Sequence, residues 1–452
     1  MVIKIMNLFI LPSQYSGDPE VVSMLQAFYS RSGEGIESRL FRLGSDLSKV
    51  KEALKKYYVG YGHQSIGDCG TLTIFIEGVS ILAAKAIQEN PLYNGQECST
   101  RYIELSGDMY LGSEHARWWQ SEYHKVKEAV LAGVRAEHPF EGFDGFDINN
   151  LEHKKPGSDY AVWENATAAR AFDIARGWIP CDALTNLSLT VSLRKASEIG
   201  NQLLGHPIEE VRQLADKMTT LLSETYPYGI VEPSINELLK SVWLSTSLNN
   251  WYIKSDYTLR EPACTLLAFT ADPSVVDMIN ARPKHTTLPH GFENYGRFCI
   301  EGYIDYGTWR DMQRHRRNVG LPPAVRPTEM HPWYVSQVQR YVSKDLAEDI
   351  ITDAQAKLEY QAMDEWDVET FQHACPLGTV VPYKYEMGLS QALYFAELRS
   401  NNTVHPILRP IAQMVGHQLR SLGIRVDNDN NPARFDVKRG TQTIVENEKE
   451  SV

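Results

Sequence analysis

Residues 71–86 read TLTIFIEGVSILAAKA, and their hydrophobic pattern changes within this stretch from that of a strand to that of a helix. Apolar and polar residues alternate over 71–76, which is typical of a strand with one buried face. Residues 79–86 instead place apolar side chains at helical spacing. A strand that runs directly into a helix predicts a fold in which both element types occur in the same domain.

Other stretches extend this plan along the chain. Residues 389–398, LSQALYFAEL, form a second helical pattern far from the first. Asp182 or Thr185 is a suitable N-cap for another helix, which would carry Leu187 and Val191 on one face. The sequence therefore predicts an α+β fold, with strands and long helices in each half of the chain.

Length and composition exclude several classes of protein. The chain has 452 residues, enough for two or three domains, and its 57 acidic residues against 45 lysines and arginines give a formal net charge of −12. A nucleic-acid-binding protein would need a basic surface instead. No stretch is long and apolar enough to span a membrane. Six cysteines lie singly, without the paired spacing of zinc or disulfide scaffolds, so we expect a reduced, cytoplasmic protein without a metal site.

Short sequence echoes indicate two diverged copies of one domain. They occur in the same order and at similar spacing in both halves, and a turn-rich stretch near residues 225–245 separates the halves. The echoes are Ile76-Glu77-Gly78 with Ile300-Glu301-Gly302, Ile179-Pro180 with Cys375-Pro376, and His206-Pro207-Ile208 with His405-Pro406-Ile407. We therefore predict a first repeat over 1–235, a second over 236–427, and a polar tail over 428–452.

The densest positive charge lies in residues 310–317, RDMQRHRR. Guanidinium groups bind phosphate oxygens through paired hydrogen bonds, so this stretch is a candidate site for a phosphorylated ligand. The alternative is a solvated helix surface. The interleaved Trp309 and Met312, and a Gly-Leu-Pro-Pro turn that follows, favour a binding site.

Residues 96–102, QECSTRY, combine hydroxyl side chains with an arginine and form a second candidate anion site. Ser99 lacks the Gly-x-Ser-x-Gly surroundings of a hydrolase nucleophile, and a lone Cys98 is equally compatible with a core residue. Residues 60–68, GYGHQSIGD, contain glycines without the Gly-x-Gly-x-x-Gly spacing of a dinucleotide-binding loop.

Together these motifs resemble the flavin-dependent thymidylate synthases. That family has a Gly-His-(Glu/Gln)-(Ser/Thr) loop, an Arg-His-Arg motif at a helix end, a Glu-x-Ser-x-Arg-Tyr segment, and a later helix with a catalytic arginine. The first half matches through Gly62-His63-Gln64-Ser65 and Glu97-Cys98-Ser99-Thr100-Arg101-Tyr102, and the second through Arg314-His315-Arg316 and Leu398-Arg399. The resemblance extends over residues 40–420 and implies two tandem repeats of the family's domain.

The two halves resemble the family in complementary parts. Where the first half should carry Arg-His-Arg, it has Gln88-Glu89-Asn90, and the Glu and Ser positions of the second half are Pro322 and Ala324. Because the family builds each site from two subunits, the resemblance implies one working set of residues divided between the halves. It also implies a homodimer that imitates the family's tetramer. Whether each site forms within one chain or between two stays open.

The resemblance implies roles for individual residues. Arg399 is the expected catalytic residue, which stabilises negative charge that grows on the base. The expected substrate-binding residues are Glu97, Ser99, Thr100, Arg101, Arg176, Asp311 and Arg314. The expected cofactor-binding residues are His63, Ser65, Arg194, Arg314, His315 and Arg316.

The implied activity is the reductive methylation of dUMP to dTMP. In the family, FAD carries the hydride, methylenetetrahydrofolate supplies the carbon, and NADPH renews the reduced flavin. Two alternatives remain, namely a related modification of another pyrimidine nucleotide, such as hydroxymethylation, and a non-catalytic nucleotide-binding protein with the same fold. Asp311 stands where the family has glutamine, and it supports the related modification.

Overall fold

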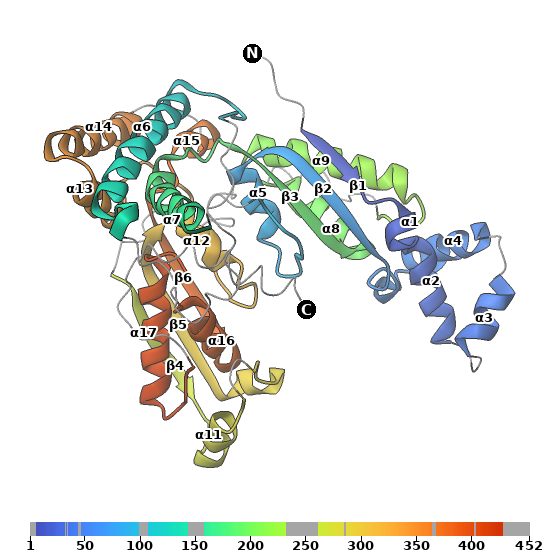
Figure 1. Cartoon of the computed structure of the whole chain (residues 1–452). Coiled ribbons are helices and arrows are strands. Elements are labelled where there is room, and N and C mark those ends of the chain that lie inside the picture. Colours follow the sequence, from blue (N-terminus) through green and yellow to red (C-terminus); the bar gives the residue numbers. More distant parts are fainter. Residues whose placement is uncertain are drawn as a thin grey trace. The chain divides into compact units, whose positions relative to one another are not determined.

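The stretch at residues 71–86 is a strand followed directly by a helix, as its pattern predicts (Figure 1). In the computed structural model, strand β2 (Thr71–Ser80) ends at Ser80, whose hydroxyl oxygen accepts a hydrogen bond from the backbone N–H of Ala83 at 3.0 Å. This N-cap starts helix α5 (Ile81–Gln88) without an intervening loop. The structure describes residues 6–31, 33, 35–43, 47–98, 107–142, 158–231, 261–283, 286–363, 368–401 and 404–427.

The chain divides into two compact units. Of the described residues, the first unit contains 6–98, 108–111 and 183–231, and the second contains 107, 112–182 and 261–427. Helices from the first half of the sequence thus belong to the second unit. A compact unit and a sequence repeat are different divisions of the chain, so the predicted repeat boundary at 235/236 stays a prediction.

The first unit is built on an antiparallel sheet with the strand order β1 (Asn7–Ile10), β2, β3 (Leu184–Ser192). Alternate residues of β2 and β3 are buried, among them Ile74 and Leu189. Helices α5, α8 (Leu193–Leu203) and α9 (Glu209–Thr225) contact the sheet and bury apolar side chains of their own. The core of this unit therefore lies between the sheet and these helices.

Short helices precede β2 in the first unit. They are α1 (Ser13–Ser16), α2 (Pro19–Tyr29), α3 (Ile36–Leu43), α4 (Ser48–Leu54), the π-helix η1 (Lys55–Gly60) and the 3-10 helix η2 (Gln64–Ile66). Because η2 includes Ser65, the Gly-His-Gln-Ser loop lies just before the central strand of the sheet.

The second unit contains an antiparallel sheet with the same plan, in the order β4 (Ala263–Phe269), β5 (Gly296–Asp305), β6 (Val380–Gly388). Helix α12 (Tyr306–Gln313) follows β5 directly, and α16 (Leu389–Arg399) follows β6 directly. The remaining elements around this sheet are α11 (Pro273–Asn280), the 3-10 helix η6 (His290–Tyr295) and α17 (Leu408–Ser421). In Figure 1, α16 and α17 lie along this sheet, which both helices contact.

A group of packed helices completes the second unit. It comprises α6 (Glu114–Glu137), η3 (Phe140–Gly142), α7 (Ser158–Ala175), η5 (Arg176–Trp178), α13 (Pro332–Tyr341), α14 (Lys344–Met363) and α15 (Val368–Ala374). Gly133 allows α6 to approach α13 closely, because a Cβ at this position would lie 1.6 Å from the carbonyl oxygen of Tyr341. Among the helices that the structure describes, none has the length and apolar character needed to cross a membrane.

The two sheets repeat each other in local detail. Asp305 caps α12 as Ser80 caps α5, accepting a hydrogen bond from the backbone N–H of Thr308 at 2.9 Å. The helix-starting N–H groups of Ile81 and Tyr306 each donate to a carbonyl just before the third strand, at 3.0 Å in both cases. The buried histidines of the two His-Pro-Ile echoes, His206 and His405, each accept a backbone N–H at ring Nδ1, from the isoleucine two residues later, at 3.2 and 3.4 Å.

The Ile179-Pro180 and Cys375-Pro376 echoes pair with each other inside the second unit. Pro180 lies opposite Pro376 in an antiparallel bridge. Around it, Cys181 N–H donates to the carbonyl of Cys375 and Leu377 N–H to that of Ile179, both at 2.8 Å. If the segment around Pro180 and the segment around Pro376 are exchanged, each of these two hydrogen bonds takes the place of the other. This local pairing has the symmetry of a two-fold axis.

Residues 184–192 correct one prediction from the sequence. They form strand β3, whereas the spacing of Leu187 and Val191 predicted a helix there. A separation of four residues keeps side chains on the same face of a strand as well as a helix. The burial of the intervening Leu189 shows the two-residue period of a strand, and the helix α8 starts only after Ser192, its N-cap.

Candidate active site

His315 lies between the end of α12 and one face of α16. Gln391, Phe395 and Arg399 recur every four residues along α16, and all three contact the imidazole ring. Arg399 Nε donates a hydrogen bond to His315 Nε2 at 2.7 Å, and Arg399 Nη2 donates to the carbonyl oxygen of Asp311 at 3.1 Å. The fold thus places the expected catalytic arginine on the Arg-His-Arg motif, from 84 residues away in sequence.

The contacts of His315 define where its proton lies. An arginine N–H can only donate, so ring Nε2 carries no proton and Nδ1 carries one. Nε2 of the Gln391 amide lies 3.1 Å from Nδ1, and a 180° flip of that amide brings its oxygen to the ring to accept the proton. Burial, followed by the charge of Arg399, lowers the pKa of His315 to about 3, so the ring is neutral near pH 7. A neutral ring held at both nitrogens fixes the orientation of the Arg399 guanidinium.

The other charged residues at the end of α12 are more open to solvent. Arg314 is the C-cap of the helix, and its side chain is 50% exposed. Its Nε lies 3.6 Å from Oδ1 of Asp311, which is a loose ion pair. Arg316 follows in the next turn and is half-buried. A cation is favoured at this end of the helix, where the carbonyl groups point outward.

Arg176 lies at the opposite end of α12 and is 1% exposed. Its Nη2 donates to the hydroxyl oxygen of Thr308 at 3.0 Å, and that oxygen also lies 3.2 Å from Nδ1 of His405. Burial alone would lower the pKa of Arg176, but the nearby Tyr334 and Asp305 outweigh it and raise that pKa. Arg176 is therefore a buried cation within a polar network, and its expected contact with a substrate phosphate stays a prediction.

The remaining described residues with expected roles lie in the first unit. Glu97 forms a buried ion pair with Lys85, and its Oε2 accepts a hydrogen bond from Gln88 at 3.1 Å. Arg194 donates to Asp68 at 2.7 Å and to Glu198 at 3.2 Å, and the first of these bonds raises its pKa.

His63 and Ser65 are exposed in the same unit, and the ring of His63 lies 6.4 Å from that of Tyr61. Ser99, Thr100 and Arg101 lie outside the described residues.

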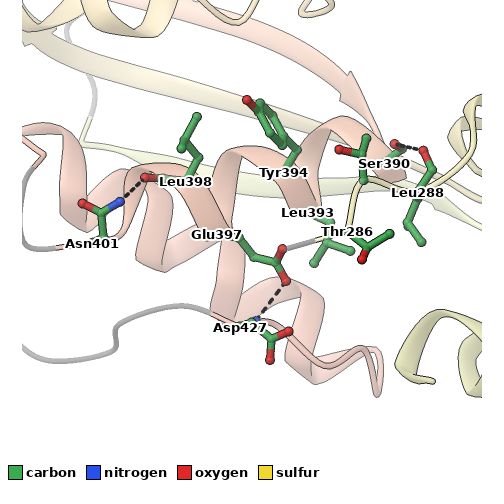
Figure 2. A pocket seen from close by; sticks show the side chains of 10 residues that line it. Thr286, Leu288, Ser390, Leu393, Tyr394, Glu397, Leu398, Asn401 and Asp427 are labelled. Carbon is green, nitrogen blue, oxygen red and sulfur yellow. Dashed lines mark hydrogen bonds between the residues drawn. The ribbon is translucent and has the colours of Figure 1, made fainter. Parts of the chain in front are cut away.

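A cavity of about 290 Å³ opens on the face of α16 next to the one that holds His315 (Figure 2). Its lining residues on α16 follow a helical period, since residues 390, 393, 394, 397 and 398 all contribute. Tyr394 belongs to both faces, because it lines the cavity and its ring centroid lies 5.8 Å from that of His315.

Sequence reasoning missed Gln391, Tyr394 and Glu397 as parts of the site. The available signal was their spacing, which places polar or amphipathic side chains on adjacent faces of an otherwise apolar helix. Without the fold, nothing distinguished these residues from an ordinary solvent-exposed face.

Two buried histidines predict that acid destabilises the protein. The folded pKa of His206 and of His315 is lowered to about 3, mainly by burial, from an ordinary value of 6.5. Between these values the unfolded chain binds protons that the folded chain does not, so stability is lost as pH falls through this range.

His206→Asn keeps an acceptor for the N–H of Ile208 and removes the titration. Urea unfolding at about pH 7 and about pH 5 should show a smaller acid loss in this variant than in the parent. An equal loss in both proteins would contradict the prediction.

Comparison with known proteins finds a family match in the first half of the chain. Residues 13–228 match the model of the family described as "Thymidylate synthase complementing protein". Two relatives extend over most of the chain. The UPF0159 protein of Chlamydia pneumoniae is 22% identical, covering 86% of this chain and 82% of its own length. UPF0159 protein Ta1429 of Thermoplasma acidophilum is 23% identical, with coverages of 91% and 92%.

A solved structure described as a UMP/dUMP methylase, PolB from Streptomyces cacaoi bound with 5-Br dUMP, has a TM-score of 0.30 and 13% identity to this chain. The match covers 53% of this chain and 95% of that one. The family match is the informative result, because it falls on the half that carries the Gly-His-Gln-Ser and Glu-x-Ser-x-Arg-Tyr motifs. Residues 13–228 are therefore similar to the thymidylate synthase complementing proteins, which confirms the resemblance to flavin-dependent thymidylate synthases found in the motifs.

Proposed function

We propose that this protein reductively methylates dUMP to dTMP, with methylenetetrahydrofolate as carbon donor and NADPH as reductant. The observation that carries the proposal is the hydrogen bond of 2.7 Å between Arg399 and His315. It joins the two second-half motifs that were matched separately to the family. The family match to residues 13–228 supports the same activity from the first half.

Arg399 is suited to the chemical step because its charge is held in place before substrate binds. His315 and the Asp311 carbonyl hold two of its nitrogens, and the side chain is only half-buried, so a ligand can reach it. A fixed cation at the edge of a pyrimidine stabilises the negative charge that grows as C5 becomes nucleophilic. His315 contributes as a positioning residue, because both of its ring nitrogens are engaged within the protein.

The end of α12 also fits the anionic part of a flavin cofactor. Arg314 is half exposed and only loosely paired, which leaves its guanidinium able to bind a diphosphate oxygen. When bound, FAD would supply the hydride of the reaction. Arg194 is less suited to this task, because Asp68 and Glu198 already neutralise it.

The proposal includes an origin by tandem duplication. The matched strand order, helix caps and histidine contacts of the two sheets support it, as does the two-fold pairing of Pro180 with Pro376. Arg176 of the first repeat bonds to Thr308 on the Arg-His-Arg helix of the second repeat within one chain. This contact favours sites that close within a chain, and two chains would then form a homodimer with two working sites.

Asp311 favours a second candidate substrate. A carboxylate accepts a hydrogen bond from the exocyclic amino group of cytosine, whereas it faces a carbonyl group in uracil. Asp311 is mostly buried beside Arg314 and Arg399, at the expected position of the base. A flavin- and folate-dependent modification of a cytosine nucleotide, such as hydroxymethylation, would suit that carboxylate.

Product analysis tests these activities directly. The full chain is incubated with FAD, NADPH and methylenetetrahydrofolate, and with either dUMP or dCMP. We expect dTMP from dUMP, formed at a rate that depends on all three additions. A modified product from dCMP alone would establish the second candidate. A protein that takes up no FAD and forms no product from either nucleotide would contradict both and indicate a nucleotide-binding protein without this chemistry.

A further inference from the structure

The cavity beside α16 has two chemically different sides. Figure 2 shows Tyr394 and Leu398 along one side, and Glu397, Thr286 and Asp427 along the other. Tyr394 is 44% exposed and Leu398 38%, which leaves their apolar atoms open to a ligand. The opposite side presents two carboxylates, and none of the described residues that line the cavity is a lysine or an arginine.

Glu397 lines the cavity, and both of its described interactions use one carboxylate oxygen. Its Oε1 forms an ion pair with Arg282 and accepts the backbone N–H of Asp427 at 3.0 Å. Both interactions end on the same oxygen, and the side chain is only 8% exposed. Oε2 takes part in neither interaction, and Glu397 lines the cavity. A carboxylate oxygen has two lone pairs, so Oε2 can accept two N–H groups from a ligand.

These features determine the kind of ligand that the cavity can accept. The described lining offers no positive charge to a phosphate, because Arg282 and Arg425, which pair with Glu397 and Asp427, are not among its residues. A flat ring is favoured by Tyr394 and Leu398, and a pair of adjacent N–H donors is favoured by Oε2 of Glu397. A cavity of about 290 Å³ is large enough for a bicyclic heterocycle.

We propose that this cavity binds the 2-amino-4-oxopyrimidine edge of a bicyclic heterocycle, with Glu397 accepting its ring N–H and amino group. Pterins and guanine share this edge. In this protein we assign the pterin of the folate co-substrate, an assignment that rests on the proposed function. Tyr394 separates the cavity from His315, and His315 in turn holds Arg399. A pterin in the cavity would therefore lie beside the expected catalytic arginine.

Binding of uncharged probes tests the cavity without any turnover. The full chain is titrated by calorimetry with 6-methylpterin and with 6-methyllumazine, in which a carbonyl replaces the amino group. We expect the lumazine to bind about ten- to a hundredfold more weakly, because it loses one charge-assisted hydrogen bond and brings an oxygen toward the carboxylate. Equal affinity for the two probes would overturn the proposal.

Variants test which side chains cause the preference for 6-methylpterin over 6-methyllumazine. Glu397→Gln should abolish the preference for the pterin, while Glu348→Gln, an exposed residue on α14, should keep it. Because Glu397 also pairs with Arg282, Tyr394→Leu provides a second variant that leaves this pair intact. It should weaken both probes, since it removes the aromatic surface. Unchanged binding in Tyr394→Leu and in a folded Glu397→Gln would remove the cavity as the site.

The same calorimetric titration distinguishes the two kinds of compound that carry the 2-amino-4-oxopyrimidine edge, pterins and guanine. Guanosine that binds more tightly than 6-methylpterin would overturn the assignment to a pterin. Failure of this inference and failure of the proposed function also give different results. Formation of dTMP without cavity-dependent pterin binding contradicts only the inference, and pterin binding that needs Glu397, without product, contradicts only the proposed activity.

Discussion

Replacing Arg399 with alanine is expected to lower kcat/KM for dTMP formation by at least about a hundredfold, because one preorganised charge partner is commonly worth about 3–4 kcal/mol in the transition state. The fold should survive, since Arg399 is half-buried on the last turn of α16. The buried Nε2 of His315 loses its donor, which costs about 1–3 kcal/mol. Steady-state kinetics below the unfolding temperature would measure the catalytic loss separately.

Two further variants make this test specific. Arg340→Ala removes an exposed arginine that pairs with Glu137, and it should leave kcat/KM unchanged. Arg399→Lys keeps the charge but lacks the planar fork that holds the His315 ring and the Asp311 carbonyl together, so its activity should remain low. In Arg399→Ala, the pKa of His315 should rise, because a neighbouring positive charge is removed. An Arg399→Ala enzyme with full activity would exclude Arg399 from catalysis.

The parts of the fold that were predictable from sequence are those with a distinctive local pattern. The strand-to-helix change at Ser80 follows from a change of hydrophobic period and an N-cap residue at the junction. Strand β3 was missed because Leu187 and Val191 satisfy both periods, and only Leu189 between them distinguishes the two. Local patterns identify helices and strands, but they fail where the apolar residues fit the helical period and the strand period equally well.

The site was predictable only where a motif marks it. Arg399 and His315 belong to family motifs, so their proximity could be expected from the resemblance. Glu397 acquires its orientation from Arg282, which lies 115 residues earlier in the chain. A residue that depends on such a distant partner has no local signature, which is why the cavity beside α16 could not be predicted.

Arg176 was identified as a site residue from sequence, but its structural surroundings were not. The resemblance assigns this arginine, which precedes an Ile-Pro turn, to a substrate phosphate, and its burial could not be inferred from neighbouring residues. Thr308, its hydrogen-bond partner, lies 132 residues later, on the helix that ends in Arg-His-Arg. The arginine is therefore also a structural cation between parts of the second unit.

Replacing Arg176 with methionine is accordingly expected to lower the free energy of unfolding more than any other single substitution described above. Asp305 is fully buried, and its neutral partners are the N–H of Thr308 and the hydroxyl of Tyr334, which donates to it at 3.0 Å. Removing the nearby cation leaves this carboxylate without its compensating charge, which commonly costs about 3–5 kcal/mol. Urea unfolding of the full chain would measure the loss, and Arg340→Met, at an exposed ion pair, should change the free energy of unfolding by less than about 1 kcal/mol.

A second substitution tests whether the uncompensated charge is the cause. Asp305→Asn keeps an acceptor for Thr308 and Tyr334 and removes the negative charge, so the double variant with Arg176→Met should be more stable than Arg176→Met alone. If the cost came only from lost packing of the arginine side chain, Asp305→Asn would restore nothing. If Arg176→Met were as stable as the parent but bound dUMP weakly, the arginine would serve the substrate phosphate, as the resemblance implies. The two roles are thus separated by measuring unfolding and nucleotide affinity on the same variant.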